Sequence, residues 1–99
     1  MISLTQQKLI LDIVSDFNPK MIGVFGSYAR GENDQNSDLD ILIDFDQTPD
    51  LLEIIGLEQE LSEKLGIKVD LITVRSLNPH LKEYVEKDLV PLVQWKKIR

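Results

Sequence analysis

An alternation of acidic and apolar residues over 38–45 constrains the fold of this 99-residue chain more than any other feature. Side chains of a β-strand alternate between its two faces, so the pattern predicts a strand with one apolar face. That face comprises Leu39, Ile41, Ile43 and Phe45, and the opposite face comprises Asp38, Asp40, Leu42 and Asp44. We expect helices to cover the apolar face only.

A second alternating strand is predicted over residues 67–74, where Ile67, Val69 and Leu71 share one face and Lys68, Asp70 and Ile72 share the other. Between the two strands, the Asp50/Glu53 pair and Gly66 are typical of a helix start and stop around residues 51–65. Its expected buried side comprises Leu51, Ile54, Ile55, Leu61 and Leu65. A helix of this length allows a right-handed crossover, which makes the two strands parallel.

The N-terminal part predicts a helix followed by a strand. Ser3 and Gln6 form a capping-box pattern, apolar residues then recur at helical spacing, and Asn18-Pro19 ends the helix. A short strand follows over residues 21–25. The turn from this strand to 38–45 is too short for a parallel crossover, so this pair is expected to be antiparallel.

The C-terminal part predicts a last helix, with Asn78 as its cap, Pro79 at its first position and an end near Asp88. Residues 89–99 fit either a strand or a loop. The expected architecture is an α/β (α+β) domain over residues 1–99, with a small mixed β-sheet and helices packed on one face.

Composition excludes several classes of protein. Eleven Lys and Arg against seventeen Asp and Glu give a net charge of −6, which argues against direct nucleic-acid binding. The absence of Cys excludes disulfides and thiolate metal sites. No apolar run approaches the roughly 18 residues of a membrane span, and residues 1–8 do not resemble a signal peptide. We therefore expect a cytoplasmic protein with no membrane partner.

Three aspartates are predicted to meet on the open face of the sheet. Asp38 and Asp40 leave the same face roughly 7 Å apart along the strand, and Asp70 comes level with them if the strands are parallel neighbours. Their mutual repulsion calls for a cation, and carboxylate oxygens suit Mg²⁺. Two such ions would stabilise the attacking and leaving oxygens of a displacement at phosphorus.

Local charge favours a metal. Six aspartates fall between residues 34 and 50, whereas Arg30 is the only basic residue between Lys20 and Lys64. The chain is thus expected to leave the cluster unneutralised. For Asp44, Asp46 and Asp50 we expect ordinary solvated acids.

The segment Phe25-Gly26-Ser27-Tyr28-Ala29-Arg30-Gly31 precedes the aspartates. A Gly and a small hydroxyl residue between a strand and a helical turn indicate an anion site made of backbone N–H groups. Two similar motifs are excluded: Glu32-Asn33 replaces the Lys and Ser/Thr of a Walker A loop, and Leu39 and Phe45 replace the Gly and Glu of an EF-hand loop.

Taken together, Gly26-Ser27, ten intervening residues, Asp38-Leu39-Asp40 and a later Asp70 resemble the nucleotidyltransferase superfamily with the DNA polymerase β-like fold. Because the chain is short, it resembles the minimal nucleotidyltransferase (MNT) branch, whose members are antitoxins paired with HEPN-domain RNase toxins. The resemblance implies transfer of AMP from ATP to a tyrosine of the toxin, which silences it, and an oligomeric state set by the toxin complex.

The resemblance also implies residue roles. Asp38 and Asp40 would hold the Mg²⁺ ions and the triphosphate, and Asp70 would complete the site as a metal ligand and general base. Gly26 and Ser27 would contact the β- and γ-phosphates. Arg30 would help to hold the phosphates or the loop.

Other residues have simpler interpretations. His80, the single histidine, is expected to be solvated, and Tyr28 to pack beside the phosphate loop. Trp95 with Lys96, Lys97 and Arg99 favours a docking tail over a frayed terminus.

Two alternative functions are open. The chain could neutralise its partner by binding alone, with the motif kept only as structure. It could also transfer a nucleotide to a small-molecule hydroxyl, although such enzymes usually carry an additional substrate domain.

Overall fold

The protein, described here from a computed structural model over residues 2–92, contains a four-stranded sheet in the order β3-β2-β1-β4. The strands are β1 (Pro19–Phe25), β2 (Leu39–Phe45), β3 (Val69–Thr73) and β4 (Val90–Pro91). The helices are α1 (Leu4–Val14), α2 (Ser27–Arg30), α3 (Leu51–Leu65) and α4 (Pro79–Asp88), with the 3-10 turns η1 (Ser15–Phe17) and η2 (Val74–Ser76). None of these helices is long and apolar enough to cross a membrane.

Strand pairing confirms the predicted mixed sheet. β1 pairs antiparallel with β2, and β2 pairs parallel with β3 across the α3 crossover. β4 pairs antiparallel with the other edge of β1, so the first residues of the C-terminal tail form a strand. The rest of that tail, including Trp95 and its basic neighbours, lies outside the described residues.

Helix ends follow the predicted caps. The Ser3 hydroxyl accepts a hydrogen bond from the Gln6 N–H at 3.1 Å, and the Gln6 side chain accepts one from the Ser3 N–H at 2.8 Å. Asp50 and Glu53 cap α3 in the same reciprocal way, and Gly66 ends that helix. The Asn78 side chain accepts from the His80 N–H at 2.8 Å at the start of α4. Each cap satisfies a backbone donor that has no partner within the helix.

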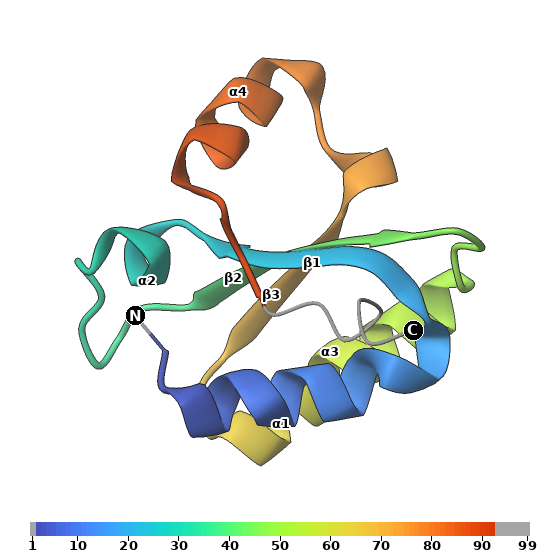
Figure 1. Cartoon of the computed structure of the whole chain (residues 1–99), viewed down its shortest axis with the longest axis horizontal. Coiled ribbons are helices and arrows are strands. Elements are labelled where there is room, and N and C mark those ends of the chain that lie inside the picture. The colour runs from blue at the N-terminus through green and yellow to red at the C-terminus, as the bar shows by residue number, and fades with distance from the viewer. Residues whose placement is uncertain (1, 93–99) are drawn as a thin grey trace.

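The main core lies between the sheet and the helices α1 and α3, which cover the same face (Figure 1). This face carries the apolar side chains of the alternating strands. The fully buried members are Ile10, Val14, Val24, Leu39, Ile41, Ile43, Leu61 and Leu92. The alternation of residues 38–45 therefore predicts the face of β2 that packs against helices.

The buried stripe of α3 differs from the predicted one. Leu61 is buried as expected and Ile54 and Leu65 are partly buried, but Leu57 is also buried. Leu51 and Ile55 were predicted to be buried, and they are 70% and 40% exposed. The stripe follows the spacing 54, 57, 61 and 65, so Ile55 lies on its flank and Leu51 lies at the helix start.

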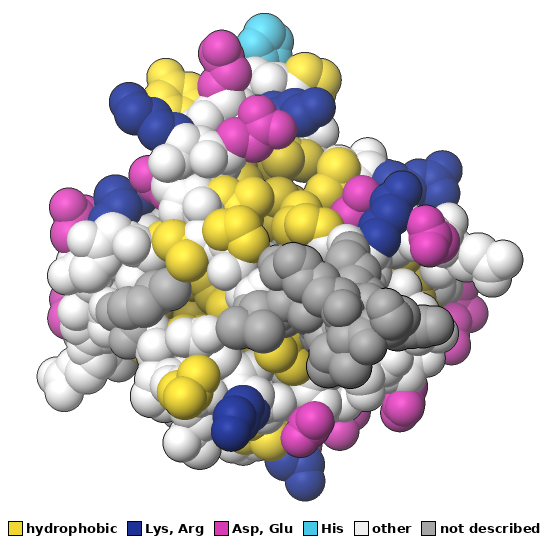
Figure 2. Space-filling model, viewed as in Figure 1, with side chains coloured by type: hydrophobic (Ala, Val, Ile, Leu, Met, Phe, Trp, Pro, Cys, Tyr) yellow, Lys and Arg dark blue, Asp and Glu magenta, His cyan; other side chains and the backbone are white. Residues whose placement is uncertain are grey.

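Helix α4 lies over the opposite face of the sheet (Figure 1), where no helix was expected. Apolar side chains gather between α4 and the sheet (Figure 2). Leu42 of β2 is only 2% exposed and Val85 of α4 is buried. A Cβ at Gly23 of β1 would lie 2.7 Å from Leu89, so the missing side chain lets the end of α4 approach the sheet. The expectation of helices on one face thus holds for α1 and α3 alone.

Side chains of α3 accept hydrogen bonds from backbone N–H groups of the edge strand β3. The Glu58 carboxylate accepts a hydrogen bond from the Leu71 N–H at 2.8 Å, and the Ser62 hydroxyl accepts one from the Val69 N–H at 2.9 Å. An edge strand otherwise presents unpaired N–H groups to solvent or to another chain. These two contacts fix β3, and with it Asp70, against the crossover helix.

Candidate active site

Asp40 and Asp70 are direct partners in the parallel pairing of β2 with β3. Asp38 comes immediately before β2, two positions from Asp40. Side chains two apart leave the same face of a strand, and residues paired in register lie level on neighbouring strands. The register confirms that β2 and β3 are parallel neighbours and places Asp40 level with Asp70. The joint site of the three aspartates stays a prediction.

Burial and neighbouring negative charges raise the pKa of Asp40. Burial is the largest cause, followed by the negative charges of Asp70 and Asp38, whereas Arg30 acts in the opposite direction. A carboxylate that loses hydration and faces like charges is harder to ionise. The Asp40 carboxylate is therefore partly buried beside two other acids.

Lysine 68 partly offsets this charge. Its Nζ lies 3.8 Å from Oδ2 of Asp38, and both side chains are largely solvent-exposed. Lys68 and Asp70 share a face of the strand region because they are two positions apart. The chain was expected to provide no positive charge near these aspartates, and Lys68 does provide one. Lys68 is distant from Asp38 in the sequence, and the parallel pairing of β3 with β2 brings the two together.

The turn at Gly26 lies directly against Asp40. Gly26 caps α2 with φ 75° and ψ −152°, a backbone region that residues with side chains essentially never adopt. A Cβ at this position would overlap Oδ2 of Asp40. Both the backbone angles and the close approach require glycine, and they bring Ser27, at the start of α2, to the same place.

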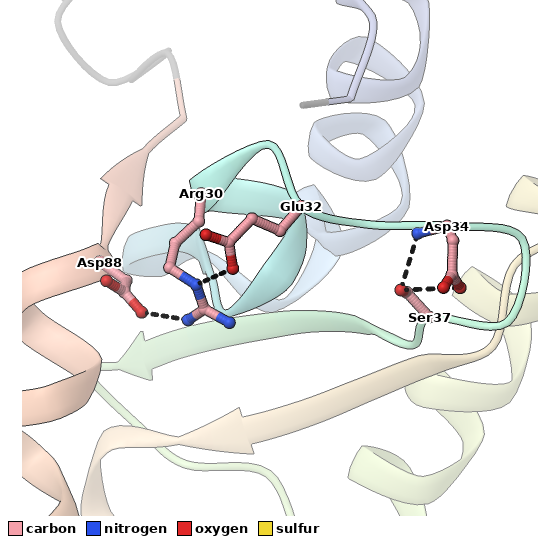
Figure 3. Close-up of polar contacts among 5 residues, drawn as sticks. All are labelled: Arg30, Glu32, Asp34, Ser37 and Asp88. Atoms are coloured by element: carbon pink, nitrogen blue, oxygen red, sulfur yellow. Dashed lines mark hydrogen bonds and ion pairs between the residues drawn. The ribbon is translucent and has the colours of Figure 1, made fainter.

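The loop from α2 to β2 is held by Asp34 (Figure 3). Its carboxylate accepts hydrogen bonds from the Asn36 N–H at 2.8 Å and from the Ser37 hydroxyl at 3.3 Å, and its own N–H donates to the Ser37 oxygen at 2.9 Å. Asp34 is therefore used in a local turn of the kind common for Asx residues. This turn leads the chain into Asp38.

These elements enclose an open cleft of about 540 Å³. Five of the six predicted site residues line it: Gly26, Ser27, Arg30, Asp38 and Asp40. Asp70 does not line the cleft but borders it as the register partner of Asp40. The remaining lining residues are Phe25, Asn36, Ser37, Tyr84, Val85 and Asp88.

Helix α4 supplies three lining residues that the sequence analysis missed: Tyr84, Val85 and Asp88. Tyr84 and Asp88 are four positions apart, which places them on one side of the helix. That spacing is visible in the sequence, but the position of α4 over the sheet is not. The wall of the cleft formed by α4 is thus a result of tertiary packing.

The other acidic and aromatic residues have the expected simpler roles. Asp44 and Asp46 lie 3.9 Å and 3.7 Å from Nζ of Lys20, and Asp50 caps α3. Tyr28 is partly buried against the main core. His80 is exposed at the start of α4. None of these five residues lines the cleft.

The carboxylates fit a hard cation in donor chemistry, since Asp38, Asp40 and Asp70 offer only oxygen ligands. Within residues 2–92, no three His, Cys, Asp or Glu side chains lie close enough together to hold a metal ion by themselves. Mg²⁺ usually takes one or two carboxylates and completes its shell with waters and substrate phosphates. The arrangement therefore suits a metal that arrives with a phosphate ligand rather than one enclosed by protein alone.

Comparison with known proteins gives a consistent match. The sequence profile of a family described as "Nucleotidyltransferase domain" matches residues 7–92. The protein adenylyltransferase MntA of Thermococcus cleftensis is 46% identical over 74 residues, which cover 75% of each chain.

Two solved structures share the fold. A crystal structure of a toxin–antitoxin pair with AMP-PNP superposes with a TM-score of 0.81 and 29% identity, covering 93% of this chain and 76% of that one. The MNT antitoxin bound to the tri-AMPylated HEPN toxin of Shewanella oneidensis gives a TM-score of 0.75 and 25% identity, covering 95% and 74%. Each likeness covers more than nine-tenths of this chain.

Proposed function

The chain belongs to the nucleotidyltransferase domain family of enzymes, and on that premise we propose that it transfers AMP from ATP to a partner toxin. The acceptor is a tyrosine hydroxyl of a HEPN-type RNase, and the transfer makes this chain the antitoxin. A relative with 46% identity is named a protein adenylyltransferase, and similar structures contain a HEPN toxin or AMP-PNP. These likenesses support both the nucleotide and the class of partner.

The observation that carries the proposal is the pairing of Asp40 with Asp70 in register, beside the turn at Gly26. Acidic oxygens and backbone N–H groups at a glycine turn are the two components that a metal-bound triphosphate needs. A purely structural role would not account for three mutually repelling carboxylates on one face. Stability alone would favour their separation.

Asp38, Asp40 and Asp70 would hold Mg²⁺, which supplies charge stabilisation for the attacking and leaving oxygens when it is bound. Backbone N–H groups of the turn and the Ser27 hydroxyl would bind the β- and γ-phosphates. Asp70 is exposed beside the cleft rather than inside it. Asp70 is therefore accessible to an acceptor hydroxyl that approaches from solvent.

The reaction is a displacement at the α-phosphorus. The acceptor oxygen forms a bond to that phosphorus, while the bond to the oxygen bridging the α- and β-phosphorus atoms breaks and pyrophosphate leaves. Asp70 takes the proton of the acceptor hydroxyl as general base. Asp38 and Asp40 would hold the Mg²⁺ that offsets their charge and that of the reacting phosphate, so that position and charge, rather than a covalent enzyme intermediate, would lower the barrier.

A growth assay tests this function. A HEPN-type RNase toxin encoded beside the chain is expressed with the wild type, with Asp38→Asn or with Asp44→Asn. Asp44 lies on the same face of β2 as Asp40 but pairs with Lys20 at the far end of the strand, which makes it a matched control. We expect the wild type and Asp44→Asn to restore growth, and Asp38→Asn to fail although it folds. Full protection by Asp38→Asn would instead indicate neutralisation by binding alone.

A further inference from the structure

Arg30 joins two elements that are far apart in the sequence (Figure 3). Its Nη1 donates a hydrogen bond to Oδ2 of Asp88 at 2.6 Å, and its Nε donates to Oε1 of Glu32 at 2.9 Å. The contact with Asp88 spans 58 positions and connects α2, which begins at the glycine turn, to the end of α4. The third guanidinium nitrogen, Nη2, takes part in neither contact (Figure 3).

Asp88 occupies an unfavourable position for a carboxylate. It is the last residue of α4, where the helix dipole disfavours negative charge. Its side chain is 24% exposed, compared with 65% for Glu32, the other partner of Arg30. Helix stability therefore does not explain Asp88, whereas its charge-assisted hydrogen bond to Arg30 does.

The location of Asp88 is fixed by packing. Val85 of α4 is buried on the sheet, and Leu89 lies against Gly23 of β1. Asp88 lies between these two packed residues in the sequence, so its position relative to the sheet is restricted. A long and flexible Arg side chain that is tied to it is restricted to the mouth of the cleft.

Arg30 is close enough to affect the chemistry. Burial, Asp70 and Asp38 raise the pKa of Asp40, and the positive charge of Arg30 partly counters this effect. Arg30, Asp88 and Asp40 all line the same cleft. The guanidinium is therefore held near the carboxylates on which a bound nucleotide would depend.

We propose that Asp88 is a positioning residue for nucleotide binding, which holds the Arg30 guanidinium at the cleft so that Nη2 can contact the nucleotide phosphates. The inference rests on the proposed function. Asp88 itself touches no phosphate and acts through Arg30. Guanidinium groups suit phosphate oxygens because their donors are planar and always charged.

The test measures binding of AMP-PNP with Mg²⁺ by titration calorimetry, together with kcat and KM for transfer to the partner toxin. The variants are Asp88→Asn, Asp88→Glu and Glu32→Gln. Glu32→Gln removes the other carboxylate partner of Arg30, which is more exposed and lies outside the cleft. We expect Asp88→Asn to weaken AMP-PNP binding by about tenfold and to raise KM more than it lowers kcat. Asp88→Glu is expected to recover most of this loss, and Glu32→Gln to change little.

A double-mutant cycle with Arg30→Ala separates positioning from a structural role. If Asp88 acts through Arg30, Asp88→Asn weakens AMP-PNP binding in the wild type but not in the Arg30→Ala background. Equal losses in both backgrounds, or wild-type affinity in Asp88→Asn, would overturn the inference. If the wild type and Asp88→Asn bind AMP-PNP equally well and both modify the toxin, only the inference about Asp88 is refuted. A wild type that does neither refutes the proposed function as well.

Discussion

The Oδ2 atom of Asp40 occupies the space in which a Cβ of residue 26 would lie. Gly26 lies between β1 and α2 as the N-cap of α2, and Asp40 is in the neighbouring strand β2, opposite Phe25. The contact joins the turn that would bind phosphate to the carboxylate with the raised pKa. The two halves of the candidate site therefore depend on one another at this point.

Gly26→Ala is expected to abolish transfer and to lower the free energy of unfolding by about 2–4 kcal/mol. The added methyl group overlaps the Asp40 carboxylate, and the backbone angles of residue 26 are strained for any side chain. Urea unfolding and a transfer assay measure both effects. Gly66→Ala is the control: its φ of 70° costs about 1–2 kcal/mol, but it lies at the end of α3 with open space around it. Activity of Gly26→Ala similar to that of Gly66→Ala would contradict the assignment.

Asp40→Asn is expected to lose activity and to gain stability at neutral pH. Folding raises the pKa of Asp40 above its value in the unfolded chain, so between these two pKa values the folded state binds more protons than the unfolded state. The free energy of unfolding contributed by Asp40 therefore falls as pH rises through this window. Replacing the carboxylate removes the penalty, with a gain of no more than about 1 kcal/mol because solvent screens it.

Urea unfolding in EDTA at several pH values measures this gain. The difference between Asp40→Asn and the wild type should shrink as the pH falls towards about 4 and should be absent well below it, where the wild-type carboxyl is protonated in both states. Asp44→Asn, whose carboxylate lies 3.9 Å from Lys20, should show no such gain. If Asp40→Asn is less stable than the wild type at pH 7, the ionised Asp40 carboxylate does not destabilise the folded state.

Mg²⁺ and nucleotide are expected to stabilise the protein together more than either does alone. Mg²⁺ usually takes only one or two protein carboxylates, so we expect phosphate oxygens to supply part of its coordination shell. At AMP-PNP a hundredfold above its Kd with Mg²⁺ present, the gain in stability is about 2.7 kcal/mol. Thermal unfolding with and without EDTA measures it. Asp40→Asn should lose the joint effect, and an equal response of that variant to AMP-PNP with Mg²⁺ would exclude a metal role for Asp40.

Glu58→Ala is expected to loosen β3 and thereby Asp70. The Leu71 N–H would lose its acceptor at the edge of the sheet, at a cost of about 1–3 kcal/mol. Hydrogen exchange at Leu71 should become faster, and Glu58→Gln, which keeps an acceptor oxygen, should remain close to the wild type. The exposed Glu60→Ala on the same helix should change stability by no more than about 0.5 kcal/mol. Equal stability of Glu58→Ala and Glu60→Ala would show that this edge contact is dispensable.

The sequence predicts well the features that depend on local periodicity. Side-chain alternation is fixed by the backbone of a strand, so the common face of Asp38, Asp40 and Asp70 follows once the strands are known to be parallel neighbours. The caps at Ser3, Asp50 and Asn78 are equally local, because their partners lie within three residues.

Features that depend on how helices pack are not predictable in this way. The acid at position 88 becomes a partner of Arg30 only because α4 crosses the open face of the sheet, which its own sequence does not encode. Lys68 reaches Asp38 only through the pairing of β3 with β2. On α3, helical spacing gives a broad apolar side, and contact with α1 and the sheet selects Leu57 rather than Ile55.

Transfer of label from ATP carrying a radioactive α-phosphate tests the central claim most directly. The purified chain is incubated with this ATP, Mg²⁺ and the HEPN-type partner, with Asp40→Asn and Asp44→Asn in parallel. The account predicts label on the partner with the wild type and with Asp44→Asn, and none with Asp40→Asn. Label from the α-phosphate that persists in Asp40→Asn, or a stable complex without any label, would contradict it.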